Sequence, residues 1–327
     1  MNIFFTFDYE LFFGRKSGTA LKSIIEPTNE LIKIADVYGV KYIFFVDSGY
    51  LLRLQEYKKK YSYIKKEYDL VFSQLEELSK KGHEIQLHIH SHWEDSFYDG
   101  KKWVFDLKRY RLHSFTKYEI EDIVKRYKKV LENFSDNIFA YRAGGWCIQP
   151  FKKIKEALKK NNIWLDSTIY YGGNNLSKTH YFDFRNAPKK TLWKFEDDPL
   201  IEQPNGTFTE IPIGYIKIYP QFFWKLIIAK KVKSTTHKVF GDGNPIGFSK
   251  KDILKLLAFP SYNVVSCDGY RSILLEKAYE LYEKNKNYNN LVIIGHPKAQ
   301  SRFSIRKIDE FVKIHKNIIT FENYFVI

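Results

Sequence analysis

The stretch HEIQLHIHSH at residues 83–92 determines how the rest of the sequence is interpreted. Its apolar residues Ile85, Leu87 and Ile89 alternate with the polar residues at 84, 86, 88 and 90. A β-strand sends two such alternating sets to opposite faces. The apolar set can pack on helices, whereas the polar set faces a barrel interior or its mouth and needs partners there. The stretch therefore predicts a strand with one chemically useful face.

Strand and helix patterns alternate on both sides of this stretch. NIFFTFDYE at 2–10 is a β-rich run, residues 26–40 have helical spacing with Pro near the start, and KYIFFV at 41–46 is a buried strand. Similar pairs follow up to the C-terminal IITFENYFVI at 318–327. Such alternation predicts an α/β fold with a parallel sheet, whose chemistry lies at the carboxyl ends of the strands.

Residues 170–250 interrupt this rhythm with Gly, Asn and Pro clusters. We interpret them as an irregular insertion with one strand, TFTEIPIGYI at 207–216. Because no repeat or low-complexity linker is found, residues 1–327 are predicted to form a single domain.

Composition limits the classes of function. The chain has 53 basic and 38 acidic residues, a formal charge of +15, yet the lysines are spread over many helices and no nucleic-acid-binding signature accompanies them. Nucleic acid is therefore disfavoured as a partner. Two cysteines, Cys147 and Cys267, are too few for a disulfide framework or a thiolate zinc site. A metal would have to use His and carboxylate ligands.

The apolar runs are too short to cross a membrane. YPQFFWKLIIAKKVK at 219–233 could lie on a membrane surface, and the alternative is an amphipathic helix packed on its own domain. The first residues lack the pattern of a secretory leader. We expect a cytoplasmic protein with peripheral membrane contact left open.

Ionisable residues follow several of the predicted strands. Asp8 and Glu10 are two apart, on one face of an extended segment, and two such carboxylates repel unless a cation lies between them. His88 and His92 have a spacing that allows two imidazoles to converge on one ion, and His90 could join them if the strand stays extended. Further strand ends carry Arg142, Asp166 and His296. Together they predict an active site.

These residues resemble the motifs of the NodB-homology, or polysaccharide deacetylase, superfamily, carbohydrate esterase family 4. The motifs occur in the family's order: T-F-D near the N-terminus, HxxxH after GHEI, then an Arg motif, an Asp and a final His after an apolar strand. The resemblance implies a distorted (β/α) barrel of about seven parallel strands that binds a divalent metal, most often zinc, and removes an acetyl group from a sugar.

The resemblance also implies roles for individual residues. Asp8 corresponds to the general base, Arg142 orients it, His296 is the general acid and Asp166 holds His296; Glu10, His88 and His92 correspond to the metal ligands. The Gly145 amide would bind the oxyanion, with Trp146 and His90 facing the substrate. The family's first motif has adjacent aspartates where this chain has Asp8, Tyr9 and Glu10, so an exchange of roles between the two acids stays open.

The sequence thus predicts a metal-dependent deacetylase, with an N-acetyl group as the expected target. The expected substrate is a nucleotide-linked or lipid-linked glycan precursor of surface polysaccharide synthesis. Two alternatives are a sugar-binding barrel without turnover and a related metal hydrolase acting on non-sugar amides.

Overall fold

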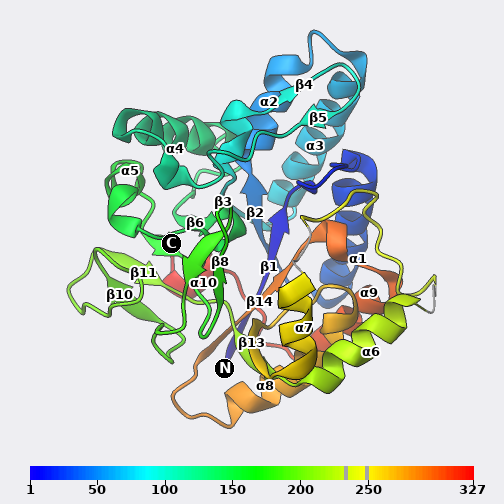
Figure 1. The fold of residues 1–327 in the computed structure, drawn as a ribbon, viewed down its shortest axis with the longest axis vertical. Coiled ribbons are helices and arrows are strands. Elements are labelled where there is room, and N and C mark those ends of the chain that lie inside the picture. Colours follow the sequence, from blue (N-terminus) through cyan, green and yellow to red (C-terminus); the bar gives the residue numbers. More distant parts are fainter. Residues whose placement is uncertain (232–234, 247–249) are drawn as a thin grey trace.

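An eight-stranded sheet forms the centre of the computed structural model, which describes residues 1–231, 235–246 and 250–327 (Figure 1). The strand order is β10-β11-β7-β6-β3-β2-β1-β14, and every neighbouring pair is parallel except β10 with β11. The prediction of about seven parallel strands in an α/β fold is confirmed. The strands are β1 (Asn2–Tyr9), β2 (Ile43–Asp47), β3 (Glu84–Ile89), β6 (Ala140–Ala143), β7 (Leu165–Asp166), β10 (Trp193–Phe195), β11 (Phe208–Glu210) and β14 (Asn290–Gly295).

Helices connect successive strands and cover the outer face of the sheet (Figure 1). Their ends follow local chemistry: the helix at 117–131 begins at a capping box of Thr116 and Glu119, and the helix at 26–38 ends on Gly39 in the left-handed region. These helices are α1 (Glu26–Tyr38), α2 (Ser48–Tyr57), α3 (Ser62–Lys80), α4 (Lys117–Leu131), α5 (Lys155–Lys160), α8 (Leu275–Glu283) and α9 (Arg302–Ile314). The strand predicted at 318–327 is wrong, because most of this stretch forms a short helix, α10 (Phe321–Phe325).

The two faces of each strand enter different apolar clusters. On β1, Phe5 and Phe7 belong to the large cluster that packs under the helices, whereas Phe4 belongs to a smaller cluster with residues from β2, β7 and β14. Phe321 of α10 closes this inner cluster, with its ring centroid 5.1 Å from that of Phe4. Since side chains alternate along a strand, Thr6, Asp8 and Glu10 continue the face of Phe4. Inside the barrel, the polar residues therefore lie toward the carboxyl ends of the strands, next to this inner apolar cluster.

Irregular segments continue the sheet beyond β14. Ile213 bridges to Val292, and Ser266, two residues after β13 (Ser261–Val264), bridges in parallel to Ile294. Cys267 donates its backbone N–H to the carbonyl of Ile294 at 2.9 Å. These bridges join Ile213, within the predicted insertion, and Ser266, after it, to the free edge of β14, which gives a distorted barrel in place of an open sheet.

The predicted insertion at 170–250 is thus only partly an excursion. β10 and β11 lie inside this range and belong to the main sheet, and the strand expected at 207–216 is divided into β11 and β12 around Pro212. The other strands and helices described in or next to this range are the hairpin β8 (Asn174–Leu176) and β9 (Tyr181–Asp183), β12 (Tyr215–Ile218), α6 (Pro220–Lys231) and α7 (Lys250–Ala258). A further hairpin, β4 (Phe97–Tyr98) and β5 (Trp103–Val104), follows β3.

The helix expected at 219–233 is α6, and its residues 232 and 233 lie outside the described part of the chain. Phe223 is buried while Trp224 and Ile228 are exposed, so α6 packs on the domain and also presents apolar side chains to solvent. Among the described helices, none has the length and apolar character needed to cross a bilayer.

Glu84, at the start of β3, should make the stability of the fold depend on pH. It is buried, and burial raises the pKa of its carboxyl to about 8, although a hydrogen bond from the backbone N–H of Glu322 favours the carboxylate. The fold therefore favours the protonated acid. This contribution to stability is fully present below about pH 4.5, the ordinary pKa of Glu, and is lost as pH rises through about 8.

We expect Glu84→Gln to flatten the pH dependence of the free energy of unfolding across this window. The wild-type protein should lose on the order of 5 kcal/mol more than the variant across the window. Urea denaturation at a series of pH values measures this difference. Glu76→Gln, at an exposed position of α3, is the control and should match the wild type. Parallel curves for Glu84→Gln and the wild type would show that Glu84 does not contribute.

Candidate metal centre at the carboxyl ends of the strands

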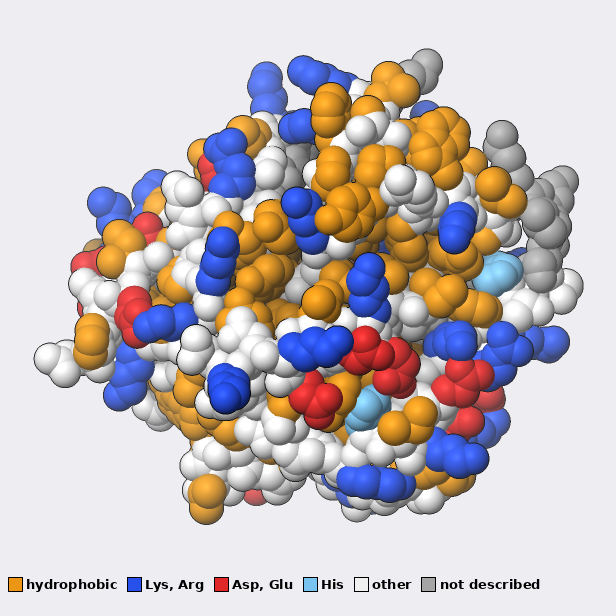
Figure 2. Space-filling view, turned by 90° about the horizontal axis from the view of Figure 1, so that it is seen from below, with side chains coloured by type: hydrophobic (Ala, Val, Ile, Leu, Met, Phe, Trp, Pro, Cys, Tyr) orange, Lys and Arg blue, Asp and Glu red, His pale blue; other side chains and the backbone are white. Residues whose placement is uncertain are grey.

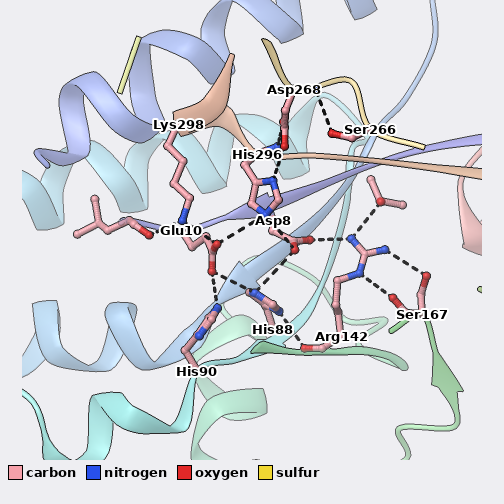
Figure 3. A network of polar contacts seen from close by, with 12 residues as sticks. Asp8, Glu10, His88, His90, Arg142, Ser167, Ser266, Asp268, His296 and Lys298 are labelled. Atoms are coloured by element: carbon pink, nitrogen blue, oxygen red, sulfur yellow. Dashed lines mark hydrogen bonds and ion pairs between the residues drawn. The ribbon is translucent and has the colours of Figure 1, made fainter. Parts of the chain in front are cut away.

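Glu10, His88 and His90 converge at the carboxyl ends of β1 and β3 (Figure 3). One ligand atom from each lies within 4.8 Å of the other two. Oε2 of Glu10 is 3.2 Å from Nε2 of His88 and 2.5 Å from Nε2 of His90. All three side chains are buried, with exposed fractions of 7%, 2% and 3%. A carboxylate and two imidazoles in this arrangement could hold a divalent metal ion.

His90 takes the place that the sequence analysis gave to His92. His88 belongs to β3 and His90 follows its end, so these two side chains share one face of an extended segment. The chain then turns into a 3-10 helix at Ser91–Asp95, which carries His92 away from Glu10. The His92 ring stacks on Tyr110 with a centroid distance of 5.3 Å. In the structure, His90 and not His92 lies beside Glu10 with His88, so the candidate ligand pair becomes His88 with His90.

The protonation states of this group suit a cation. Burial lowers the pKa of His90 to about 4, which leaves a neutral imidazole. Burial alone would raise the pKa of Glu10, but Lys298 and His90 outweigh it and hold the pKa well below its usual range. Nε2 of His90 lies 2.5 Å from Oε2 of Glu10, and Nε2 of His88 lies 3.2 Å from the same oxygen. An anionic oxygen and two imidazole nitrogens that face the same point fit a metal site.

His88 is oriented from its other side. Its Nδ1 lies 2.8 Å from the carbonyl oxygen of Arg142, which fixes the proton on Nδ1 and leaves Nε2 toward Glu10. Burial opposes a charge on His88, but Asp8 and Glu10 outweigh burial and raise its pKa. The two buried carboxylates thus favour a positive charge between them, as a bound cation would provide.

Lys298 holds the second oxygen of Glu10, a contact that the sequence analysis missed. Its Nζ lies 2.8 Å from Oε1 of Glu10 and donates to the carbonyl of Leu11 at 2.6 Å. Lys298 is 9% exposed, so this ion pair is shielded from solvent. Its position two residues after His296, at the end of the same strand, is the signal by which it could have been found.

Asp8 lies beside this group and is bound by Arg142. Oδ1 of Asp8 accepts a hydrogen bond of 2.6 Å from the guanidinium, which also contacts Thr6 and Ser167. Burial would raise the pKa of Asp8, but Arg142, His88 and His296 outweigh it and lower the pKa. The structure therefore presents Asp8 as a carboxylate, with Oδ2 3.6 Å from Nε2 of His296.

His296 is held by Asp268 rather than by the predicted Asp166. Nδ1 of His296 lies 2.8 Å from Oδ2 of Asp268, and the backbone N–H of His296 donates to the other oxygen at 2.7 Å. The bridge of Ser266 to Ile294 sets this register, because Asp268 and His296 each follow two residues later. The run NVVSCD at 263–268, apolar and then acidic, is the signal that could have indicated Asp268.

Asp166 serves a different local structure. Its carboxylate accepts hydrogen bonds from the hydroxyl and the backbone N–H of Thr168 and lies beside Glu210. Burial, and then Asp166, raise the pKa of Glu210 well above its usual range. Close to Asp166, the Glu210 carboxyl group therefore favours its protonated form at the ends of β7 and β11.

Gly145 and Trp146 lie in the turn that follows β6. Gly145 has a φ of +59°, and a Cβ there would lie 2.7 Å from His180 and from Tyr110. The preceding Gly144 packs on His90, where a Cβ would meet the ring at 2.6 Å. This turn borders the candidate metal centre, and the roles expected for Gly145 and Trp146 in substrate binding stay predictions.

Comparisons with known proteins give structural likenesses. No family model and no curated protein sequence matches the chain. A putative polysaccharide deacetylase from Mycobacterium smegmatis is similar over 99% of this chain and 87% of that one, with 15% identity and a TM-score of 0.47. The allantoinase Puue matches over 97% and 85%, with 11% identity and a TM-score of 0.49.

A third structure, the peptidoglycan deacetylase PdaC from Bacillus subtilis, matches over 98% of this chain and 88% of that one, with 10% identity and a TM-score of 0.38. Polysaccharide deacetylases are thus among the solved structures that this chain resembles. At these identities the function has to be argued from the geometry of the site itself.

We expect Asp268→Asn to lower the pKa of His296. Burial alone lowers this pKa, and Asp268 is the largest contribution that raises it above its ordinary value. NMR titration of the histidine rings in metal-free protein measures the change. Glu276→Gln removes the acid that lies 3.0 Å from His315 at the surface, and it is the matched control that should leave His296 unchanged. An unchanged pKa of His296 in Asp268→Asn would contradict the assigned pairing.

Proposed function

We propose that this protein is a metal-dependent deacetylase that removes an acetyl group, most readily an N-acetyl group, from a sugar. The observation that carries the proposal is the buried group of Glu10, His88 and His90 with Asp8 and His296 beside it. A binding site alone does not need both a carboxylate base and a carboxylate-paired histidine next to its metal ligands.

The chain's own residues supply the proton transfers of such a reaction. Asp8 is anionic, and its Oδ2 is not engaged by Arg142, so it can accept a proton from the attacking water. His296 carries a raised pKa beside Asp268, so it can hold a proton and donate it to the leaving amine. A divalent ion, when bound, would polarise the acetyl carbonyl and increase the acidity of water.

The donor set favours zinc, because two imidazoles and one carboxylate are ligands typical of hydrolytic zinc sites. The carbohydrate substrate follows from the motif resemblance of the sequence. We propose a nucleotide-linked or lipid-linked glycan precursor of surface polysaccharide synthesis, whose negative charge suits the charge of +15 on the chain. The cytoplasmic location stays a prediction.

We expect His90→Ala to lose metal and His92→Ala to retain it. The expectation follows from the 2.5 Å separation between His90 and Glu10, compared with the stacking of His92 on Tyr110. Metal content after purification with added zinc, measured by elemental analysis, gives the comparison. Mutation of a residue that only orients a metal ligand typically lowers metal affinity about 10- to 100-fold. Loss of one of three ligands themselves should therefore lower it at least tenfold.

His88→Ala is the positive control for loss of metal, because both the sequence and the structure assign His88 to the site. Retention of metal in His90→Ala together with loss in His92→Ala would overturn the proposed set of ligands. Circular dichroism of the three variants shows whether each has folded.

We expect the protein to release acetate from N-acetylated sugars, and chelation to abolish the release. Asp8→Asn keeps the shape of the side chain but removes the base, so the rate should fall by about 10²- to 10⁴-fold while the metal is retained. Asp69→Asn, on the exposed face of α3, is the control and should keep full activity.

Zero release by the wild-type protein across a broad panel of acetylated sugars would overturn the proposal and favour a binding barrel. Release from non-sugar amides alone would instead assign the site to a related amide hydrolase. Activity that survives Asp8→Asn would show that Asp8 is not the base and would favour the opposite assignment of the two acids.

A further inference from the structure

Apolar side chains gather on an exposed face formed by α6, α7 and the adjoining strands β12 and β13. Exposed fractions reach 53% for Trp224, 60% for Ile228, 66% for Leu254 and 64% for Phe259. Figure 2 shows hydrophobic side chains grouped on the corresponding side of the molecule, with Lys and Arg among them. The α6–α7 face is defined here by Tyr219, Trp224, Ile228, Ile253, Leu254, Phe259 and Tyr262.

The two helices form one continuous surface. Phe223 is 4% exposed and anchors α6 to the domain. Nε1 of Trp224 donates to the carbonyl of Leu257 at 3.3 Å, which ties α6 to α7. α6 therefore has apolar residues on both its buried and its exposed side. This is expected of a helix that packs on its own domain and also contacts a second apolar partner.

Basic residues accompany this apolar surface. Residues 211–262 contain nine lysines and two acidic residues, Asp242 and Asp252. Among the described side chains, Lys217, Lys225, Lys251 and Lys255 are exposed on the same elements. Apolar and aromatic side chains beside exposed lysines match the boundary between acyl chains and anionic headgroups.

We propose that the α6–α7 face docks on an anionic lipid bilayer. Trp224, Ile228, Leu254 and Phe259 would enter the headgroup region, and the lysines would contact lipid phosphates. A second copy of the chain fits this face less well, because a two-fold interface would bring the same lysines against one another. An anionic membrane offers both an apolar region for the exposed apolar side chains and negative charge for the lysines.

The docking face is connected to the candidate metal centre. Phe222 of α6 packs on Tyr270 with ring centroids 5.6 Å apart, and Tyr270 follows Asp268 by two residues. Asp268 and His296 are the more open part of the centre, with side chains 19% and 22% exposed. If the proposed function holds, docking would bring this side of the site close to the sugar of a lipid-linked substrate. The bilayer contact itself does not depend on that function.

The test is vesicle flotation of the full-length protein. We expect binding to vesicles of phosphatidylcholine with phosphatidylglycerol, weaker binding to phosphatidylcholine alone, and a decrease as salt rises. Each of Lys225→Gln and Lys255→Gln should weaken binding to the anionic vesicles about fivefold. Ile228→Ser with Leu254→Ser should weaken it about tenfold or more.

Val37→Ser and Ile314→Ser form the matched control, because these apolar residues are 73% and 65% exposed on α1 and α9 and do not belong to the α6–α7 face. They should bind vesicles as the wild type does. The tryptophan fluorescence should shift to shorter wavelength on binding, because Trp224 is exposed, whereas Trp146 and Trp164 are half-buried and Trp93, Trp103 and Trp193 are buried. Trp224→Phe should remove this shift.

Three outcomes would overturn the proposal. One is the absence of binding to anionic vesicles, and another is equal loss of binding in the control and the α6–α7 variants. The third is a concentration-dependent dimer that the α6–α7 variants abolish without any vesicle binding, which would assign the face to self-association. None of these measurements uses deacetylase activity, so failure of docking and failure of the proposed function are distinguishable.

Discussion

The buried ion pair of Arg142 and Asp8 is the interaction around which the upper part of the barrel is organised. Arg142 is fully buried, and its guanidinium reaches Thr6 and Asp8 on β1 and Ser167 after β7. It also lies 4.0 Å above the ring of Phe45. A buried charge of this kind is tolerated only when its hydrogen-bonding groups are satisfied. The ends of three strands are thereby fixed relative to one another, between the inner apolar cluster and the candidate metal centre.

Asp8 and Glu10 are each paired with a different basic side chain, which gives the two acids different surroundings. Arg142 binds Oδ1 of Asp8, and Lys298 binds Oε1 of Glu10. The remaining oxygen of Glu10 faces His88 and His90, whereas that of Asp8 lies within 4 Å of both His88 and His296. Under the proposed function, this geometry favours Glu10 as the metal ligand and Asp8 as the base. The sequence alone leaves an exchange of these roles open, because two acids on one face are equivalent until their partners are known.

Local patterns were sufficient for the parts of the fold and site that depend on one strand at a time. The alternation in residues 83–92 predicted β3 and its polar inner face, and Asp8, Glu10, His88, Arg142 and His296 were all expected at strand ends. The sequence predicts His92 instead of His90 as the second imidazole ligand, because residue spacing does not show where a strand turns into a 3-10 helix. Asp268 was missed because its position depends on a single bridge between Ser266 and Ile294, and such long-range pairing leaves no local pattern. Lys298 was missed for a related reason, since its partner Glu10 lies at the other end of the chain.

Differences in exposure across the site bear on how a substrate would approach. The side chains of His88 and Glu10 are 2% and 7% exposed, but those of His296 and Asp268 are 22% and 19% exposed. Under the proposed function, only a small group such as acetyl can reach the ligand side, and the rest of the sugar has to stay on the side of β14. The general acid would then meet the leaving amine at the more open edge of the site, while the carbonyl enters the buried part. This edge is also formed by the segment that leads from Asp268 to Tyr270, against which α6 packs. A membrane contact made by α6 and a substrate that enters past His296 are therefore compatible features of the same side of the barrel.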